Sequence, residues 1–348
     1  MRKYSIAVVP GDGVGPEVVT AARRVLDQAV SQAGGFQLAY TEYPAGKQAY
    51  ETVGQALPPA TLAGMRQADA TLLGALAAEL VPSPSPTGQL RKALDLFADV
   101  RPVKALRGAW AQKPDIDIVC IRENNQGFLA DRNLYKGCGE FMPTDDVVMS
   151  VRVLSRRNCE QIARYAFAFA RSHNRKKITV AHKANVLQMG CTFFLDIVRE
   201  VAKEFNDIEL DTEYVDSVAN HLISAPDKYD ILLTTNLFGD ILSDEAAALV
   251  SNLVPTANIG HEAAVFRPMH EACLKEAGHN VINPLSAILS GAMLLSYLGE
   301  TGAAQMMETA VEAVLSEGAV RPKDMAGTGT TTEVTAAVCD KVRILGGS

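Results

Sequence analysis

Short apolar runs alternate with amphipathic segments along most of this chain. Hydrophobic runs bounded by polar or turn residues are typical of buried strands, and they predict strands over 4–9, 70–73, 116–122, 177–181 and 230–234. Apolar positions spaced three and four residues apart predict helices over 17–33, 156–171, 191–205, 242–249, 284–298 and 303–317. The stretch 90–97 is also amphipathic, and the alternation in VVMSVRVLS predicts a strand over 147–155. Strands that alternate with helices indicate an α/β fold.

Length and composition favour two domains and exclude several classes of protein. The 348 residues, 48% of them hydrophobic, provide for about two domains with buried cores. The net charge of −7 disfavours a general nucleic-acid binder, which needs a basic face. No apolar stretch reaches the roughly 20 residues of a membrane helix, and the first run ends at Pro10, short of a secretory signal. Six cysteines without a C-x-x-C pair are typical of reduced thiols, so we expect a cytoplasmic protein.

The turn PGDGVGPE joins the first predicted strand to the first predicted helix. Its glycines, Gly11, Gly13 and Gly15, imitate the dinucleotide-binding fingerprint, but their spacing is G-x-G-x-G rather than G-x-G-x-x-G. No acidic residue closes an obvious second strand roughly 20 residues later, as that fingerprint requires. A tight turn that lets the backbone approach a ligand or a neighbouring strand is the better interpretation. We therefore do not expect a Rossmann domain.

Two carboxylates lie one helical turn apart in LLTTNLFGDILSDEAA. Asp240 and Asp244 follow an apolar strand and Gly239, which predicts a position at the start of a helix, with both side chains on one face. Like charges this close require compensation by arginines or a divalent cation, and hard oxygen ligands favour Mg²⁺ or Mn²⁺. The alternative is a pair of exposed carboxylates that only stabilise the helix dipole.

Three arginines and a lysine stand near the ends of predicted elements. Arg91, Arg101 and Arg122 occur in QLRKALDLFADVRP and CIREN, and Lys183 follows the strand of KITVAHKANV. An arginine fork binds a carboxylate through two hydrogen bonds, although a single arginine is more often an ordinary surface or ion-paired residue. Together with the aspartate pair, these side chains predict a site for a polycarboxylate chelated to a metal.

The motifs and their order resemble one family of enzymes over nearly the whole chain. They are VVPGDGVGPEV, LRKALDLFADVRPVK, REN, AHKANVL, VDSVAN, LLTTNLFGDILSDEAA, ANIG and NPLSAILSGAMLL. In them the chain resembles the β-decarboxylating dehydrogenases, which act on isocitrate, isopropylmalate, homoisocitrate or tartrate. The resemblance implies a two-domain α/β fold of the isocitrate/isopropylmalate dehydrogenase type with an active-site cleft between the domains. Residues 1–99 and 252–348 would form the larger, cofactor-side domain. Residues 100–251 would form a smaller central domain for dimerisation, the metal and the catalytic lysine.

The resemblance also implies how substrate and proton are handled. Arg91, Arg101 and Arg122 match the arginines that hold the carboxylates of a malate. Lys183 matches a lysine, supplied by the partner subunit of a homodimer, that works with water and the metal to take the hydroxyl proton. Asn185 falls where the family contacts nicotinamide and substrate. The implied reaction is the NAD(P)-dependent oxidative decarboxylation of a 3-substituted malate.

The implied metal site combines residues of two subunits. Asp240 and Asp244 match two ligands of Mg²⁺ or Mn²⁺. Asp216, in VDSVAN, matches a third ligand from across the dimer interface and stands with Lys183 among the implied catalytic residues. A cation in such a site polarises the substrate hydroxyl and carboxylate, which is the chemistry that hydride removal and decarboxylation need.

The cofactor segment departs from the family pattern. Residues 270–278 read HEACLKEAG where the family usually reads H-G-[ST]-A-P-D-I-A-G. Lys275 stands where NAD-using members have the aspartate that binds the adenosine ribose, and NADP-using relatives carry a lysine there. NADP is therefore slightly favoured over NAD, although Glu271 and Glu276 would repel its 2′-phosphate. The implied cofactor contacts are Asn185, His270, Lys275 and Asn283.

The proton donor of the family is also missing from its usual position. The run RENNQGFL places Leu129 where family members have the tyrosine that protonates the enolate, and leucine cannot donate a proton. Tyr135, six residues later, is the nearest candidate to replace it. Decarboxylation could therefore be slow, depend on water or be absent. Oxidation without loss of carbon dioxide, and a non-catalytic regulatory or metabolite-binding paralogue, are the alternatives.

The segment before Arg91 bears on substrate choice. Isopropylmalate enzymes carry apolar side chains there, whereas isocitrate enzymes carry hydroxyl or amide side chains. In VPSPSPTGQLR the chain offers Ser85 and Thr87, together with Ser83 and Gln89. Each polar group left unpaired against an isopropyl group would cost about 1–3 kcal/mol. Ser85 and Thr87 therefore favour a substrate of the isocitrate or homoisocitrate type over isopropylmalate.

Overall fold

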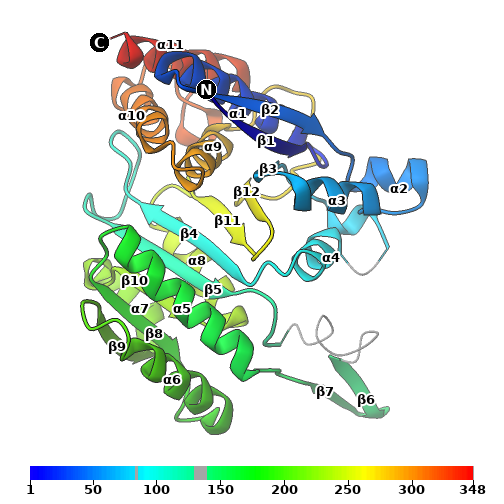
Figure 1. The fold of residues 1–348 in the computed structure, drawn as a ribbon, viewed down its shortest axis with the longest axis vertical. Coiled ribbons are helices and arrows are strands. Elements are labelled where there is room, and N and C mark those ends of the chain that lie inside the picture. The colour runs from blue at the N-terminus through cyan, green and yellow to red at the C-terminus, as the bar shows by residue number, and fades with distance from the viewer. Residues whose placement is uncertain (83–84, 129–138, 348) are drawn as a thin grey trace. The chain divides into compact units, whose positions relative to one another are not determined.

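The computed structural model describes residues 1–82, 85–128 and 139–347, which form two compact units (Figure 1). Unit 1 consists of Met1–Leu94, Ala105–Pro114 and Val250–Ser348, and unit 2 of Asp95–Lys104 and Asp115–Leu249. The expected division placed 95–99 in the terminal domain and 105–114 and 250–251 in the central one, so the two partitions differ at these residues. The roles expected for the two domains stay predictions.

The strands of unit 1 form a mixed arrangement in the order β2-β1-β3-β12-β11. β1 (Arg2–Val9) pairs in parallel with both β2 (Phe36–Glu42) and β3 (Ala70–Leu73). β12 (Ala264–Pro268) pairs in parallel with β3 and antiparallel with β11 (Pro255–Ile259). All four residues of β3 and all five of β11 are buried, which is typical of strands covered on both faces.

Helices cover the strands of unit 1. The bounds are Gly15–Ala33 (α1), Lys47–Val53 (α2), Pro59–Gln67 (α3), Pro86–Ala93 (α4), Leu285–Tyr297 (α9), Thr301–Glu317 (α10) and Thr331–Gly346 (α11). α1 contacts α9, α10 and α11, and Figure 1 shows these four helices gathered together. α9 also contacts β3, β11 and β12 and is apolar on nearly all sides, as a core helix must be.

The strands of unit 2 follow the order β4-β5-β10-β8-β9. β4 (Ala98–Lys104) and β5 (Asp117–Glu123) are antiparallel, and β10 (Ile231–Thr234) is parallel to β5. β8 (Lys177–His182) lies between β10 and the edge strand β9 (Glu209–Tyr214), parallel to both. The carboxyl ends of β5, β8 and β10 therefore lie at one edge, where ligands of open α/β sheets bind.

Two pairs of helices and a hairpin complete unit 2. The bounds are Arg156–Ser172 (α5), Gln188–Ala202 (α6), Val215–Ser224 (α7) and Asn236–Ala248 (α8), with the hairpin strands Glu140–Thr144 (β6) and Val147–Ser150 (β7). α5 packs on α6 and α7 on α8, and the pairs lie on opposite faces of the strands (Figure 1). The described ranges contain no helix long and apolar enough to cross a bilayer.

The α/β class is confirmed, and three element predictions need correction. The predicted strand 147–155 ends at Ser150, because only Val153 pairs further, in an isolated bridge to Gly127, and Ser155 already caps α5. The amphipathic stretch 90–97 is the end of α4, whose start is set by Pro86 and the Ser85 cap. The helix predicted over 242–249 begins six residues earlier, at the start of α8.

Candidate active site

Arg101, Arg122, Asp240 and Asp244 meet in unit 2. Arg101 lies on β4 and Arg122 on β5, while both aspartates lie on α8. Arg101 donates to Asp244 Oδ1 at 3.0 Å and to Asp240 Oδ1 at 3.3 Å. Arg122 Nη1 also donates to Asp240 Oδ1. The structure thus joins the predicted aspartate pair to two of the predicted arginines.

A buried carboxylate that sequence reasoning missed fixes the two guanidinium groups. Asp99 is fully buried and accepts from Arg101 Nη2 at 2.9 Å and from Arg122 Nη1 at 3.5 Å. Ser243 Oγ, 2.7 Å from Arg101 Nη1, and Asn236 Oδ1, 2.8 Å from Arg122 Nη2, hold the outer nitrogens. One signal was available, because residues two apart on a strand share a face, as Asp99 and Arg101 do.

Gly239 allows α8 to approach β5 closely enough for these contacts. A Cβ atom at this position would lie 2.7 Å from both Cβ and Cγ of Arg122, so any larger residue would push the helix away. Since α8 begins at Asn236, Asp240 is in its second turn and the first turn has no acidic residue. The prediction that Asp240 and Asp244 stand at the start of the helix is therefore wrong by about one turn. Carboxylates stabilise the helix dipole only in the first turn, so the alternative role of these aspartates as dipole-stabilising residues loses its basis.

The electrostatics of the cluster favour an additional cation. Burial lowers the pKa of Arg101, but Asp99, Asp240 and Asp244 outweigh this effect and raise it overall. For Arg122, burial prevails and the pKa is lowered. Burial and the charge of Asp240 raise the pKa of Asp244. The described residues thus place three carboxylates against two guanidinium groups, and a bound cation would offset the excess negative charge.

The donor atoms fit part of a divalent metal site. The side chains of Asp240 and Asp244 are 48% and 66% exposed, so each retains an open side for a ligand. Within 1–82, 85–128 and 139–347, no three His, Cys, Asp or Glu side chains of the chain are grouped to hold a metal. Asp216 therefore does not form a three-ligand metal site with Asp240 and Asp244 of the same chain. The chain offers two hard oxygen ligands, and further ligands must come from elsewhere.

Lys183 and Asp216 form a pair of their own in unit 2. Lys183 follows β8 and donates from Nζ to Asp216 Oδ1 at 2.5 Å, at the start of α7. This hydrogen bond lowers the pKa of Asp216, whose side chain is 63% exposed. Asn185 is exposed in the turn that follows Lys183. The structure places the two predicted catalytic residues together and leaves the carboxylate open to a further partner.

Glu213 precedes the helix that carries Asp216 and ties the last turn of that helix to the segment beyond it. This half-buried carboxylate at the end of β9 lies 2.5 Å from His221 Nδ1, and it accepts from Lys228 Nζ at 2.9 Å and from Tyr229 Oη at 3.0 Å. Burial raises its pKa, but the bonds from Lys228, Tyr229 and His221 outweigh this and hold the pKa below its ordinary value of 4.5.

We expect Glu213→Gln to lower the free energy of unfolding by about 1–3 kcal/mol at pH 7, since hydrogen bonds to a charged group are lost. The lowered pKa means that the carboxylate stabilises the fold above pH 4.5, and that this contribution disappears as the pH falls through the folded-state pKa. Urea unfolding from pH 7 to pH 3 measures the difference, which should shrink in acid. Glu209→Gln, an exposed carboxylate on the same strand, is the control; a difference for Glu213→Gln that is constant with pH would contradict the explanation.

The predicted substrate residues Arg91, Ser85 and Thr87 lie on or beside α4 in unit 1. Arg91 is buried, and its Nε donates to Asn258 Oδ1 on β11 at 3.1 Å. Ser85 is the N-cap of α4, where its Oγ accepts from the Gly88 amide at 3.1 Å. Thr87 is half-buried in the first turn. Helix capping is thus a function of Ser85 that sequence reasoning missed, and the substrate roles of all three residues stay predictions.

The predicted cofactor residues of unit 1 differ in their burial and in their hydrogen bonds within the protein. His270 Nδ1 lies 2.8 Å from the Glu271 carbonyl, while Nε2 is buried and has no hydrogen-bond partner among the described residues. Burial lowers the pKa of His270, so the neutral ring keeps Nε2 as an acceptor for a ligand. Lys275 is exposed. Asn283 is buried, donates to both oxygens of Asp324 and accepts from the Leu285 amide, so it holds the start of α9.

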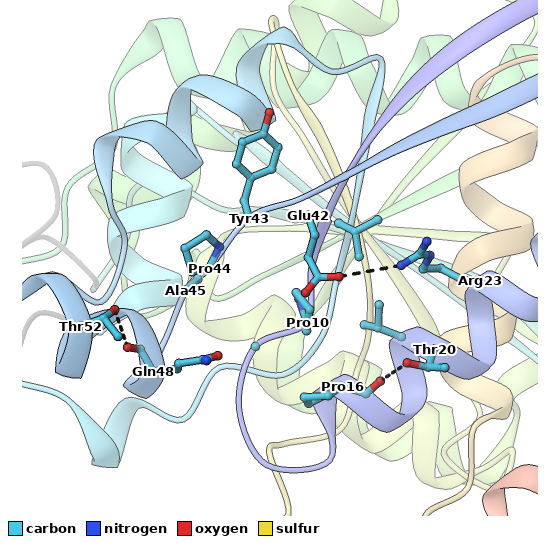
Figure 2. A pocket seen from close by; sticks show the side chains of 13 residues that line it. Pro10, Pro16, Thr20, Arg23, Glu42, Tyr43, Pro44, Ala45, Gln48 and Thr52 are labelled. Atoms are coloured by element: carbon cyan, nitrogen blue, oxygen red, sulfur yellow. Dashed lines mark hydrogen bonds and ion pairs between the residues drawn. The ribbon is translucent and has the colours of Figure 1, made fainter.

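Two cavities in unit 1 lie near or apart from the predicted site residues. A cavity of about 440 Å³ adjoins the end of the 270–278 segment and is lined by Glu17, Arg24, Gly278, Asn280 and Thr332, among others. Figure 2 shows a second cavity, of about 460 Å³, whose lining includes Thr20, Arg23, Glu42 and Gln48 but no predicted site residue. Leu129 and Tyr135 lie outside the described residues.

Comparison with known proteins identifies the family to which the chain belongs. The family model described as isocitrate/isopropylmalate dehydrogenase matches residues 5–340. The 3-isopropylmalate dehydrogenase of Archaeoglobus fulgidus is 40% identical over 94% of this chain and 96% of its own length. The isocitrate/homoisocitrate dehydrogenase of Thermus thermophilus is also 40% identical, over 98% and 99%. The crystal structure of isocitrate dehydrogenase from Methylococcus capsulatus superposes with a TM-score of 0.89 at 38% identity, covering 99% of this chain and 100% of that one.

These matches span nearly the entire chain and confirm both the fold type and the enzyme class predicted from the motifs. The relatives carry different substrate names, so the match identifies the class of reaction and leaves the substrate open. The chain belongs to the isocitrate/isopropylmalate dehydrogenase family, the NAD(P)-dependent decarboxylating dehydrogenases that act on a CH–OH group.

Proposed function

We propose that this protein oxidises and decarboxylates a 3-substituted malate of the isocitrate or homoisocitrate type, with Mg²⁺ or Mn²⁺ and NAD(P). The observation that carries the proposal is the cluster in unit 2, where two buried arginines are fixed by Asp99 and face Asp240 and Asp244. Guanidinium groups that are already oriented bind a diacid with little loss of side-chain freedom. The two open carboxylates beside them suit a divalent cation that chelates the same substrate.

In the proposed mechanism Arg101 and Arg122 bind and orient the substrate carboxylates. A divalent cation held by Asp240, Asp244 and the partner subunit's Asp216 would supply Lewis-acid chemistry at the substrate hydroxyl and carboxylate. The partner subunit's Lys183 accepts the proton of the hydroxyl, either directly or through water, as hydride leaves for nicotinamide. Asp99 does not touch the substrate, but keeps both arginines in place.

The surface of unit 2 supports a homodimer with shared sites. Every residue of the β6–β7 hairpin is exposed, including Phe141, Met142, Val148 and Met149, and an isolated two-stranded hairpin is marginal in water. Apolar exposure of this kind marks an interface. The predicted site has two parts in unit 2, Lys183 with Asp216 and Asp240 with Asp244, and both adjoin exposed apolar side chains. Val186 and Met189 follow Lys183, and Leu237 and Ile241 flank Asp240.

A twofold axis would explain why the metal ligands are divided. In a symmetric dimer each surface patch meets its counterpart, so the Lys183–Asp216 half of one subunit can complete the Asp240–Asp244 half of the other. A single chain then needs only two ligands of its own, in agreement with the absence of a three-ligand group among its described residues.

The coenzyme is NAD or NADP, and Lys275 favours NADP. This lysine is exposed on the 270–278 segment, where a cation can pair with a 2′-phosphate. The buried Nε2 of His270, which no described residue pairs, offers an acceptor on the same segment. Glu271 and Glu276 are exposed there too and oppose a phosphate, so we expect a small preference.

The substrate assignment rests on the polar character of α4. Ser85 and Thr87 present hydroxyl groups at the start of the helix whose last turn carries Arg91. The Ser85 oxygen accepts a backbone N–H, but its hydroxyl hydrogen can still be donated to a carboxylate. An isopropyl group would leave these hydroxyl groups unpaired.

A panel of substrates tests the proposal. Isocitrate, homoisocitrate, 3-isopropylmalate, tartrate and malate are each assayed with NAD and NADP in the presence of Mn²⁺, and carbon dioxide is measured against reduced nicotinamide. We expect kcat/KM to be highest for isocitrate or homoisocitrate, by about tenfold or more over 3-isopropylmalate, with equal amounts of both products. Preference for 3-isopropylmalate would refute the substrate assignment, and no reduction with any substrate would refute the function.

A further inference from the structure

The turn between β1 and α1 is tied to three other segments of unit 1, to two of them through Asp12 and to the third through Val14. The Asp12 carboxylate is 6% exposed and accepts two backbone amides, that of Lys47 at 2.8 Å and that of Ala77 at 2.9 Å. The Asp12 amide donates to the Ala75 carbonyl at 2.7 Å, and the Val14 amide donates to the Ala272 carbonyl at 2.9 Å. One turn thus binds residues 75–77, the start of α2 and the 270–278 segment.

The glycines of the turn are required by these close contacts. A Cβ atom on Gly11 would lie 2.1 Å from the Ala75 carbonyl oxygen, and one on Gly13 would lie 1.9 Å from the Ala272 carbonyl oxygen. Gly46 has φ of 79°, and its Cβ would lie 2.2 Å from Asp12 Oδ2. The turn therefore brings its backbone against neighbouring segments. This agrees with the interpretation of the glycine pattern as a tight turn rather than a dinucleotide-binding fingerprint.

Two of the segments adjoin predicted ligand-binding residues in the sequence. Residues 75–77 precede α4, which carries Arg91 and Thr87, and Ala272 lies between His270 and Lys275. Ala75, Ala77 and Ala272 also form one small buried cluster, against which Leu80 packs. The substrate side and the cofactor side of unit 1 therefore share a common anchor. Figure 2 shows that Pro10 and Pro16, which flank the turn, line the same cavity as Ala45 and Gln48, near the start of α2.

We infer that Asp12 is a positioning residue that sets the placement of α4 and of the 270–278 segment together, so that substrate and coenzyme affinity both depend on it. The inference rests on the proposed roles of those two segments. The carboxylate is suited to this task because both of its oxygens accept backbone amides. An asparagine would present one NH₂ group to an N–H donor, so one of the two contacts would be lost.

The test compares Asp12→Asn with the wild-type enzyme. We expect the KM for the best hydroxy acid and the Kd for NADPH, measured by its fluorescence, each to rise about tenfold, because a small displacement of binding groups weakens binding strongly. At saturating concentrations kcat should change by less than about threefold, since the reacting groups of unit 2 are untouched. Simple destabilisation would instead reduce kcat through the folded fraction and leave both constants unchanged.

Hydrogen exchange gives a readout that does not depend on turnover. In Asp12→Asn the amides of Lys47 and Ala77 should exchange faster than in the wild type. Asp69→Asn is the matched control, because Asp69 accepts the Ser5 amide in the middle of β1 and has no hydrogen bond to either segment among the described residues; its KM and Kd should be those of the wild type. If Asp12→Asn does not fold, Leu80→Ala replaces it, with the same two constants expected to rise about threefold.

The outcomes separate the inference from the proposed function. Unchanged KM, Kd and exchange in a folded Asp12→Asn enzyme, or unchanged constants in Leu80→Ala, would overturn the inference while the wild type remains active. A wild type that reduces no coenzyme with any substrate would overturn the proposed function. The NADPH and exchange measurements would still decide whether Asp12 positions the two segments.

Discussion

Replacing Asp240 with asparagine is expected to lower kcat/KM by about 1,000-fold, because in the proposed mechanism it removes a carboxylate ligand of the metal and several kcal/mol of transition-state stabilisation. The amide oxygen can still accept from Arg122, and Asp99 and Asn236 continue to hold that guanidinium group, so the fold should survive. Mn²⁺ titration followed by electron paramagnetic resonance should show weaker metal binding. High Mn²⁺ should recover part of the activity.

Glu245→Gln is the matched control for this loss of charge. Glu245 lies on the same helix, next to Asp244, and burial raises its pKa, but neither arginine of the cluster contacts it. Its kinetics and Mn²⁺ affinity should be close to those of the wild type. If Asp240→Asn retains wild-type kcat/KM and Mn²⁺ affinity, Asp240 is not a metal ligand.

Lys183→Met should reduce kcat by about 100- to 10,000-fold, the range expected when a general base is removed. Methionine preserves much of the length and the apolar body of the side chain but cannot accept a proton. Substrate KM and Mn²⁺ affinity should change much less, since Arg101, Arg122, Asp240 and Asp244 remain. Lys203→Met, which removes an exposed lysine of unit 2, is the control. Stopped-flow reduction of NADP measures the chemical step; an unchanged rate would exclude Lys183 as the base.

Spacing within single elements made part of the site predictable from the sequence. The i, i+4 relation of Asp240 and Asp244 puts two carboxylates on one face of any helix that contains them. Arg122, at the end of a predicted strand, points to the sheet edge where ligands bind. Asp99 was within reach of the same reasoning, because it stands two residues before Arg101 on one strand.

The remaining contacts depend on how elements approach one another. Asn236 and Ser243 become arginine partners only because α8 approaches β5 at Gly239, and no local pattern encodes that approach. The start of α8 was misplaced because its N-cap, Thr235, makes no side-chain capping bond and Gly239 resembles a helix boundary. At Asp12 the sequence predicts only a turn, since the partners of this carboxylate are backbone amides far along the chain.

Some elements escaped prediction although their signals were present, and others contradict their local sequence. α11 begins with a capping box of Thr330 and Glu333, a pattern that sequence reasoning could have used. β4 contains Pro102, which argues against a strand, yet it pairs with β5 along its length. β9 is a polar edge strand, so it lacks the hydrophobic run that revealed its neighbours. Tertiary pairing outweighs local propensity in both strands.

Mixing the two inactive variants tests most directly whether the site is shared between subunits. Asp240→Asn and Lys183→Met chains are unfolded together, refolded in equal amounts and assayed with the best substrate from the panel. In a mixed dimer one site carries both substitutions and the other carries neither, so random pairing should restore about a quarter of wild-type activity. Activity no higher than the mean of the two separate variants, in refolded mixed dimers, would contradict a site in which Asp240 of one subunit works with Lys183 of the other.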